Sequence, residues 1–305
     1  SLNHAAWKIL AGMSEVAIVG GIESYSTMTA KFPMSRPQYK LIPPYPIAQG
    51  LTPNEERNVD MITVSDRMAA KWKISRVEAD EYAMRSQQRL HEAYKNGDAG
   101  ANMIPVTIPA TKKTPEFVVE KDEFPRPETT MEGLGKLKQV RPDCVTTAGN
   151  ASGRNDGAAF LLVMTEEKAE EYGYRPIARW IGGAQCGCQE DLMGIGPAYS
   201  NLKAIKAAGL ELKDIDVIEC NEAFAAQQLS VIKEMESQTG RAIDQERWNP
   251  NGGAISIGHP NGASGARIAL FAMNHMIRTG GRYGIISSCC GGGHGTTSIL
   301  ENLCR

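Results

Sequence analysis

The residues with the clearest capacity for chemistry are grouped in four stretches rich in glycine and asparagine. These stretches are TTAGNASGRNDGAA (146–159), ECNEAFAAQ (219–227), NPNGGAISIGHPNGASGAR (249–267) and SSCCGGGHG (287–295). Each adjoins the end of a predicted strand or helix. Because ligands of α/β proteins gather where loops leave the carboxyl ends of strands, we expect the four stretches to converge on one pocket.

The last stretch joins two cysteines to a glycine run and a histidine. Cys289 and Cys290 are followed by three glycines and His294. A cysteine close to glycine N–H groups and a histidine can have a lowered pKa and act as a nucleophile or a base. Taken alone, the segment favours a plain turn with buried, inert thiols. A phosphate loop is excluded because the lysine and the following helix that it needs are missing.

Two further side chains stand at predicted helix starts. His259, in a G-H-P turn before a helix expected near Ala263, is placed to act as an acid or base or to bind an oxyanion. A structural histidine closing the turn is the alternative. Asn221 and Glu222 follow a buried strand, where helix capping and the helix dipole would explain them without catalysis.

Composition narrows the class of protein. With 305 residues, 42% hydrophobic and 22% charged, the chain is typical of a soluble globular protein with one large or two ordinary domains. A net charge of −2 gives no electrostatic case for nucleic acid or an anionic membrane, and no apolar run is long enough to span a bilayer. Seven cysteines, an odd number, indicate a reducing compartment, and we expect the cytoplasm. Scattered histidines and a single C-x-C pair predict no metal site.

The elements that must position these residues follow from pattern. Buried strands are predicted over 15–21 and 156–164, and a helix over 75–97 in which Ser75 and Glu78 form a capping box. The stretches between, about 28–62 and 100–147, are expected to be irregular. Beyond them strands and helices alternate, which predicts an α/β domain with a mostly parallel sheet. The last two strands, joined by the glycine turn, are expected as an antiparallel pair at the edge of that sheet.

Several motifs in order resemble the thiolase family. They are GGIES, TAGNASGxNDGAA, MGIGP, NEAFAAQ, NxNGGAIxxGHPxGASGAR and CxGGGxG, and NEAF, GHP and CxGGG at this spacing are specific. The resemblance runs from residue 1 to the last strand. It implies the thiolase fold, an α/β fold of two similar halves in αβαβα layers with an inserted loop domain. The chain would divide into 1–23 (rest of the first half, incomplete here), 24–147 (loop domain), 148–164 (last strand of that half) and 165–305 (second half).

The resemblance also implies an activity. Thiolases perform acyl transfer on coenzyme A thioesters, either thiolysis of a 3-ketoacyl-CoA, as in fatty-acid β-oxidation, or the reverse Claisen condensation, by a two-cysteine ping-pong mechanism. The substrates would be CoA and acyl-CoA, with no other cofactor and no metal. A homodimer or homotetramer is expected.

Four catalytic roles are carried over from the resemblance. Cys289 matches the acid/base cysteine, and His259 the histidine that helps to activate the nucleophile and binds a thioester oxygen. Asn221 matches the asparagine that positions a water in the same oxyanion hole, and the Gly291 N–H would serve a second hole. A decarboxylating ketoacyl synthase would have a second histidine where Cys289 stands.

Five binding residues follow in the same way. Ser152, Ala148 and Phe224 match residues that line the pantetheine channel. Met61 and Met193 match the acyl pocket, with core packing as a strong competing interpretation.

The sequence departs from the family pattern in two ways. The resemblance implies a nucleophilic cysteine in a C-x-S/G-G motif at the start of the helix that SLNHAAWKIL continues, a handful of residues before Ser1. No cysteine precedes Cys144, so the nucleophile is expected on a preceding segment or a separate chain. A non-catalytic CoA-binding or scaffolding subunit is therefore the alternative function. Cys290 stands at a usually aliphatic position and is interpreted as packing, and His294 and Ile62 also differ from the pattern.

Overall fold

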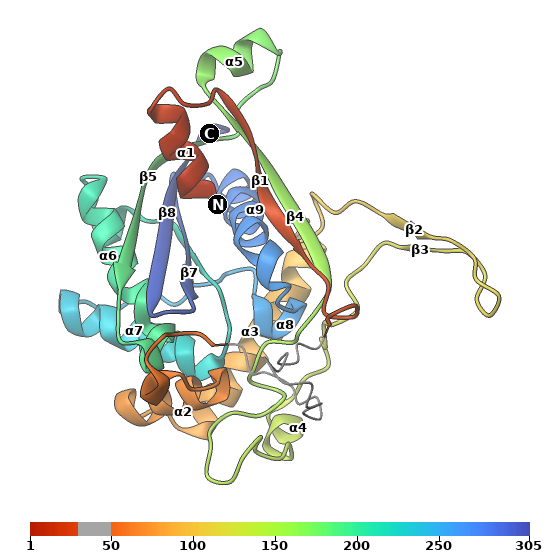
Figure 1. Ribbon diagram of the computed structural model, residues 1–305, viewed down its shortest axis with the longest axis vertical. Helices are drawn as coiled ribbons and strands as arrows, with labels where there is room; N and C mark the ends of the chain where they lie inside the picture. The colour runs from red at the N-terminus through yellow and green to blue at the C-terminus, as the bar shows by residue number, and fades with distance from the viewer. Residues whose placement is uncertain (30–49) are drawn as a thin grey trace, which may run out of the picture.

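The computed structural model describes residues 1–29 and 50–305, so much of the predicted irregular stretch 28–62 lies outside the described residues. Two helices lie between two sheets (Figure 1). They are α1 (Leu2–Leu10) and α9 (Asn261–Thr279). The smaller sheet pairs β1 (Val16–Glu23) with β4 (Gly157–Met164) in antiparallel register.

The larger sheet has the strand order β5-β8-β7-β6. Its strands are β5 (Ala178–Gly187), β6 (Val217–Cys220), β7 (Tyr283–Cys290) and β8 (His294–Asn302). The antiparallel pairing of β7 and β8 is confirmed, but β8 lies inside the sheet, so the expected edge position is wrong. Only the β6–β7 pairing is parallel, which also corrects the mostly parallel sheet. Strand–helix alternation does not reveal that the last strand inserts between two earlier ones.

The strands β1 and β4 were expected to be buried, but each is exposed on one face. Ile18 is 76% exposed and Phe160 51% exposed on the face turned away from α9. The burial alternates along both strands because only one face of this two-stranded sheet packs on a helix.

Helix α6 (Gly196–Ala207) covers the other face of the larger sheet, and α7 (Ala225–Thr239) packs against α6. The described layers are therefore helix, sheet, helix, sheet, which are four of the five layers expected. The core between them is fully buried at Trp248, Met235 and Ile285.

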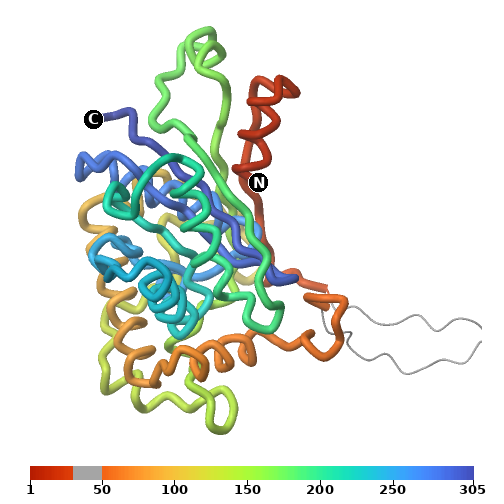
Figure 2. The backbone as a smooth tube through the Cα atoms, turned by 90° about the vertical axis from the view of Figure 1, so that its left-hand side faces the viewer, coloured from red at the N-terminus to blue at the C-terminus, as the bar shows by residue number. Residues whose placement is uncertain are grey.

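The region between β1 and β4 adds three helices and a hairpin. These are α2 (Met61–Trp72), α3 (Arg76–Asn96), α4 (Met131–Gly135), and β2 (Val106–Ile108) paired with β3 (Phe117–Val119). The hairpin projects from the body (Figure 1). Helices α2 and α3 gather at the end of the molecule opposite α5 (Glu166–Glu171) (Figure 2). The division of the chain at 23/24, 147/148 and 164/165 stays a prediction.

The start of α3 forms as the sequence predicts. The Ser75 N–H donates to Oε2 of Glu78 (2.7 Å), the Glu78 N–H donates to Oγ of Ser75 (3.2 Å), and Gly97 ends the helix at φ 88°. The remaining short elements are α8 (Ala254–Ile257) and the 3₁₀ turns Glu55–Arg57, Glu190–Ile195 and Leu212–Asp214.

Candidate active site

Three of the four glycine-rich stretches are hydrogen-bonded to one another. The Ser152 N–H donates to the Ala223 carbonyl (3.0 Å), which ties the first stretch to the second. The His259 N–H donates to the Gly153 carbonyl (3.0 Å), which ties the third stretch to the first. The predicted convergence of these three loops is confirmed.

The fourth stretch reaches the same place through the sheet. The Asn221 N–H donates to the Ser287 carbonyl (2.9 Å), and Cys220 pairs with Ser287 in the parallel register of β6 and β7. Cys289 lies two residues further along β7. Because parallel strands end at the same edge of a sheet, Cys289 and Asn221 share one edge.

Asn221 and His259 are in direct contact. The carboxamide Nδ2 of Asn221 lies 3.3 Å from Nε2 of His259. The Oδ1 atom of Asn221 is buried and has no hydrogen-bond partner among the described residues. Such an acceptor is costly unless a water or ligand group satisfies it. The capping interpretation is wrong, because Phe224 is the N-cap residue of α7.

The ring of His259 is held at its other nitrogen by a serine. Nδ1 lies 2.7 Å from Oγ of Ser264, which donates to the carbonyl of Pro260 (3.0 Å). Because the Ser264 hydroxyl donates its proton to a carbonyl, its oxygen accepts a hydrogen bond from Nδ1–H of His259. Nε2 is then the unprotonated, basic nitrogen of the ring, and it faces Asn221. Burial, together with the positive charge of Arg267, lowers the pKa of His259 to about 4. The imidazole is therefore neutral at neutral pH.

Cys289 is a protonated thiol in this environment. It is half-buried at the end of β7, and burial raises its pKa to about 12, with smaller contributions from nearby Cys220 and Cys290. The lowered pKa that the sequence suggested is wrong, because desolvation disfavours the thiolate.

The glycine run is required by close approaches of the backbone. Gly292 and Gly293 have φ of 82° and 76°, in the left-handed region that favours glycine. A Cβ on Gly293 would overlap the carbonyl of Cys188, whose N–H donates to the Gly293 carbonyl (2.7 Å). Leu51 lies beside the exposed Gly291, since a Cβ added to Gly291 would stand 3.2 Å from Cδ2 of Leu51. Leu51 was missed because it lies in a stretch without pattern.

Cys290 and His294 pair across the turn, and both are exposed. The interpretation of Cys290 as a packing residue is wrong, because its side chain is exposed at the last position of β7.

The five candidate binding residues fall into two groups. Ala151 forms a β-bridge with Phe224, which puts Ser152 beside Phe224, and Ala148 is exposed on the same loop. Met193 is only 6% exposed, and Met61 is half-buried against the same hydrophobic core. The methionines thus contribute to core packing, the competing interpretation.

Glu222 is a functional candidate that the sequence interpretation dismissed. Its buried carboxylate accepts hydrogen bonds from the Tyr82 hydroxyl (2.9 Å), the Ser86 hydroxyl (2.7 Å) and Nδ2 of Asn249 (3.1 Å). A helix-dipole role is wrong, because Glu222 precedes α7 by three residues. A carboxylate directly after a buried strand was the signal that could have revealed it.

A cavity of about 1270 Å³ lies between α9 and the base of the hairpin β2–β3. Its lining includes Asn155 and the two sequence neighbours of His259, Gly258 and Pro260. Neither His259 itself nor Cys289 lines it. The cavity therefore adjoins the predicted site and does not contain its two titratable side chains.

The layered α/β fold and the cysteine, histidine and asparagine at one sheet edge define an enzyme site that can move a proton and hold an oxyanion. The family model "Thiolase, N-terminal domain" matches residues 1–167, and "Thiolase, C-terminal domain" matches residues 174–302. The chain therefore belongs to the thiolase family and has the thiolase fold. Its chemistry is acyl transfer on CoA thioesters.

Individual relatives agree. The chain is 38% identical over 306 residues to an acetyl-CoA acetyltransferase of Chromobacterium violaceum and 41% identical over 320 residues to a β-ketoadipyl-CoA thiolase of Pseudomonas putida. Each match covers 99% of this chain and 76% of the relative. A human mitochondrial 3-ketoacyl-CoA thiolase solved in complex with CoA superposes with a TM-score of 0.87 at 36% identity, covering 99% of this chain and 74% of that one. Among the described helices, none is long and apolar enough to cross a membrane.

Proposed function

We propose that Cys289 carries the proton in this acyl transfer, while His259 and Asn221 hold the thioester oxygen. The observation that supports the proposal is the 3.3 Å contact between Asn221 and His259, beside a buried Asn221 oxygen without a partner among the described residues. Carboxamide and imidazole at that spacing suit a water-assisted oxyanion hole.

The proton step begins at Cys289. After the Cys289 thiol has lost its proton to solvent, its thiolate takes an α-proton from acetyl-CoA, so that an S–H bond forms and a C–H bond breaks. The electron pair moves to the thioester oxygen as an enolate. Hydrogen bonds from His259 and from a water held by Asn221 stabilise that oxygen, by about 3 kcal/mol for each preorganised donor. In thiolysis the same thiol returns the proton.

His259 reaches its donor state through Ser264. When the Ser264 hydroxyl donates to Nδ1 instead of to the Pro260 carbonyl, the ring proton resides on Nε2. In the other tautomer, Nε2 accepts the proton of an attacking thiol, and the resulting imidazolium binds the thioester oxygen through its Nε2–H while Nδ1–H donates to Ser264. The second oxyanion hole is proposed at the exposed Gly291 N–H. The family resemblance expects the acyl-carrying thiol ahead of Ser1, and the first cysteine of this chain is Cys144. We therefore assign that thiol to no residue of this chain.

The binding proposal places CoA over the first and second glycine-rich stretches. Ser152, Ala148 and Phe224 would line the pantetheine arm. Met61 and Met193, which also pack on the core, would border the acyl end. We propose CoA and acyl-CoA as the only small-molecule partners, no metal, and a homodimer or homotetramer. All seven cysteines lie among the described residues as free thiols, which supports a cytoplasmic location.

Equilibrium titration with CoA tests the binding proposal. Ser152→Trp should weaken CoA binding about tenfold or more, because the indole would fill the channel. Ser237→Trp, on the exposed side of α7, is the matched control and should bind like the wild type. Equal affinity of Ser152→Trp and wild type would place the channel elsewhere. The alternative, a non-catalytic CoA-binding subunit, predicts the same titration but no proton exchange on bound acetyl-CoA.

A further inference from the structure

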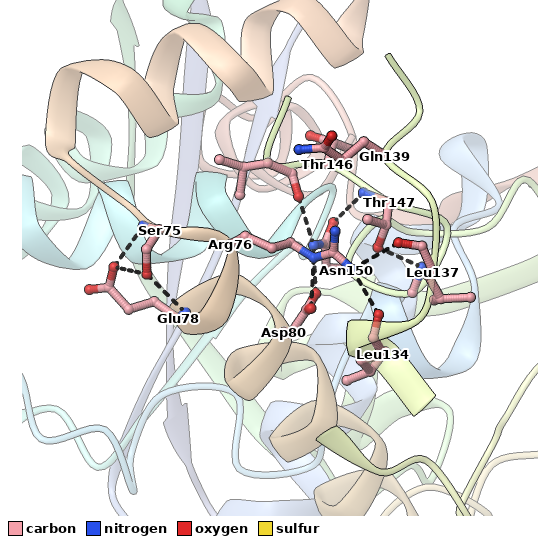
Figure 3. A network of polar contacts seen from close by, with 12 residues as sticks. Ser75, Arg76, Glu78, Asp80, Leu134, Leu137, Gln139, Thr146, Thr147 and Asn150 are labelled. Carbon is pink, nitrogen blue, oxygen red and sulfur yellow. Dashed lines mark hydrogen bonds and ion pairs between the residues drawn. The ribbon is translucent and has the colours of Figure 1, made fainter. Parts of the chain in front are cut away.

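A buried carboxylate on α3 faces the first glycine-rich stretch. Asp80 is 2% exposed and has a partner on each oxygen. Oδ2 accepts from Nε of Arg76 (2.7 Å), and Oδ1 accepts from Nδ2 of Asn150 (2.8 Å). Figure 3 shows Asp80 between these two side chains. A charged acceptor with two donors is satisfied in spite of its burial.

Arg76 extends the network to α4. Its Nη2 donates to the carbonyls of Leu134 (2.7 Å) and Leu137 (3.2 Å), at and just after the end of that helix (Figure 3). Helices α3 and α4 are thus joined through one guanidinium.

Asn150 extends the network in the other direction, within the first glycine-rich stretch (146–159), over which we propose that CoA binds. Its Oδ1 accepts from the Thr147 N–H (2.8 Å), and its backbone carbonyl accepts from the Ala225 N–H (2.9 Å). Ala225 is the first residue of α7, and its N-cap Phe224 makes no side-chain capping bond within the described part of the chain. The carbonyl of Asn150 therefore takes over part of the capping of α7.

We propose that Asp80 is a positioning residue for CoA binding. Through Asn150 it fixes the loop that carries Ala148 and Ser152 and the helix start that carries Phe224. The inference rests on the proposed function, which assigns those three residues to the pantetheine channel. The present proposal adds that helices α3 and α4, which lie between β1 and β4 in the sequence, set the shape of the channel without touching CoA.

The direction of the Asp80–Asn150 hydrogen bond allows a test in which donor and acceptor are exchanged. Asn150→Asp places two carboxylates face to face in a buried site. Asp80→Asn, the milder change, leaves one side-chain oxygen for two donors, Arg76 and Asn150. The double variant Asp80→Asn/Asn150→Asp restores a donor and an acceptor in the opposite order, while the carboxamide oxygen introduced at position 80 still accepts from Arg76. Two losses remain: the Arg76–Asp80 ion pair becomes a neutral hydrogen bond, and the carboxylate at position 150 faces the Val145 carbonyl, to which Nδ2 of Asn150 donates in the wild type (3.1 Å).

The experiment measures CoA affinity and amide hydrogen exchange of Thr147 and Ala225 in both single variants and the double variant. Each single change should weaken CoA binding about tenfold and speed exchange at both amides, and the double variant should recover part of each loss. Wild-type values in both single variants would overturn the inference. So would a double variant no better than the sum of its parts.

Two controls keep this outcome separate from the proposed function. Glu132→Gln removes an exposed carboxylate that pairs with Lys136 at i,i+4 on α4 and should change neither measurement. If the wild type itself binds no CoA, the proposed function fails. Amide exchange in Asp80→Asn and in the double variant then still decides whether Asp80 fixes the loop.

Discussion

Nδ2 of Asn221 lies 3.3 Å from Nε2 of His259, although 38 positions separate the two residues in the sequence. The contact joins the end of β6 to the G-H-P turn before α9, so the two motifs meet at the position that we propose binds the thioester oxygen. The unpartnered Oδ1 of Asn221, buried within the described residues, is free to hold a water there.

Asn221→Ala removes the residue that we propose holds the water, and it removes the contact with Nε2 of His259. We expect kcat of α-proton exchange on acetyl-CoA, a step that needs no acyl-carrying thiol, to fall about hundredfold, because one preorganised oxyanion donor is lost. KM for acetyl-CoA should change little, since the contact acts on charge that develops during the reaction. Steady-state kinetics measure both constants, and a change confined to KM would contradict the role.

The neutral state of His259 makes stability depend on pH. Its pKa is about 4 in the folded chain and 6.5 ordinarily, so between these values the unfolded chain binds a proton that the folded chain does not. The free energy of unfolding should therefore fall as the pH falls from about 6.5 to about 4, and this contribution should be flat above that window. Urea titrations at several pH values on wild type and His259→Gln isolate it as a difference. Parallel pH curves for the two proteins would show that His259 titrates normally.

Ser264→Ala removes the hydroxyl that holds Nδ1 of His259 at 2.7 Å. Without it the ring loses its orientation and its route between the two tautomers. The loss of one buried hydrogen bond predicts a fall of about tenfold in kcat of the same α-proton exchange, with KM for acetyl-CoA unchanged. An unaltered kcat would mean that the ring is oriented by Asn221 alone.

Gly295 pairs with Cys289 across β7 and β8, and its backbone lies against Gly196 at the start of α6. A methyl group there would overlap the Gly196 backbone, so Gly295→Ala should destabilise the fold by about 3 kcal/mol. Gly187→Ala on β5 is the control, because no described atom lies within 4 Å of the added Cβ; it should stay within about 0.5 kcal/mol. Thermal unfolding compares the two, and equal melting temperatures would contradict the packing described.

Local patterns in the sequence predicted the elements well. The capping box of Ser75 and Glu78 and the glycine stop at Gly97 depend only on neighbouring residues, and the helix α3 has both. The same holds for the antiparallel pair β7–β8, because a short glycine turn leaves it few alternatives.

The predictions that were wrong concern residues whose interaction partners are distant in the sequence. Nothing near β8 indicates that it pairs with β5 on its other side. The pKa of Cys289 is set by burial in a folded sheet, which outweighs any glycine N–H nearby. Asp80 and Asn150 stand 70 positions apart in the sequence, and only the fold brings them together.

The role of Cys289 in exchanging the α-proton of a bound acyl-CoA is tested most directly by incubating the protein with acetyl-CoA in D₂O. Proton NMR follows the acetyl methyl signal, and this step needs no acyl-carrying thiol. We predict deuterium incorporation that speeds up as the pH rises, because the thiolate fraction of Cys289 grows toward its pKa of about 12. Cys289→Ser should slow exchange about hundredfold or more, and Cys290→Ser, at the exposed neighbour, should not. Exchange at the wild-type rate in Cys289→Ser would contradict this role.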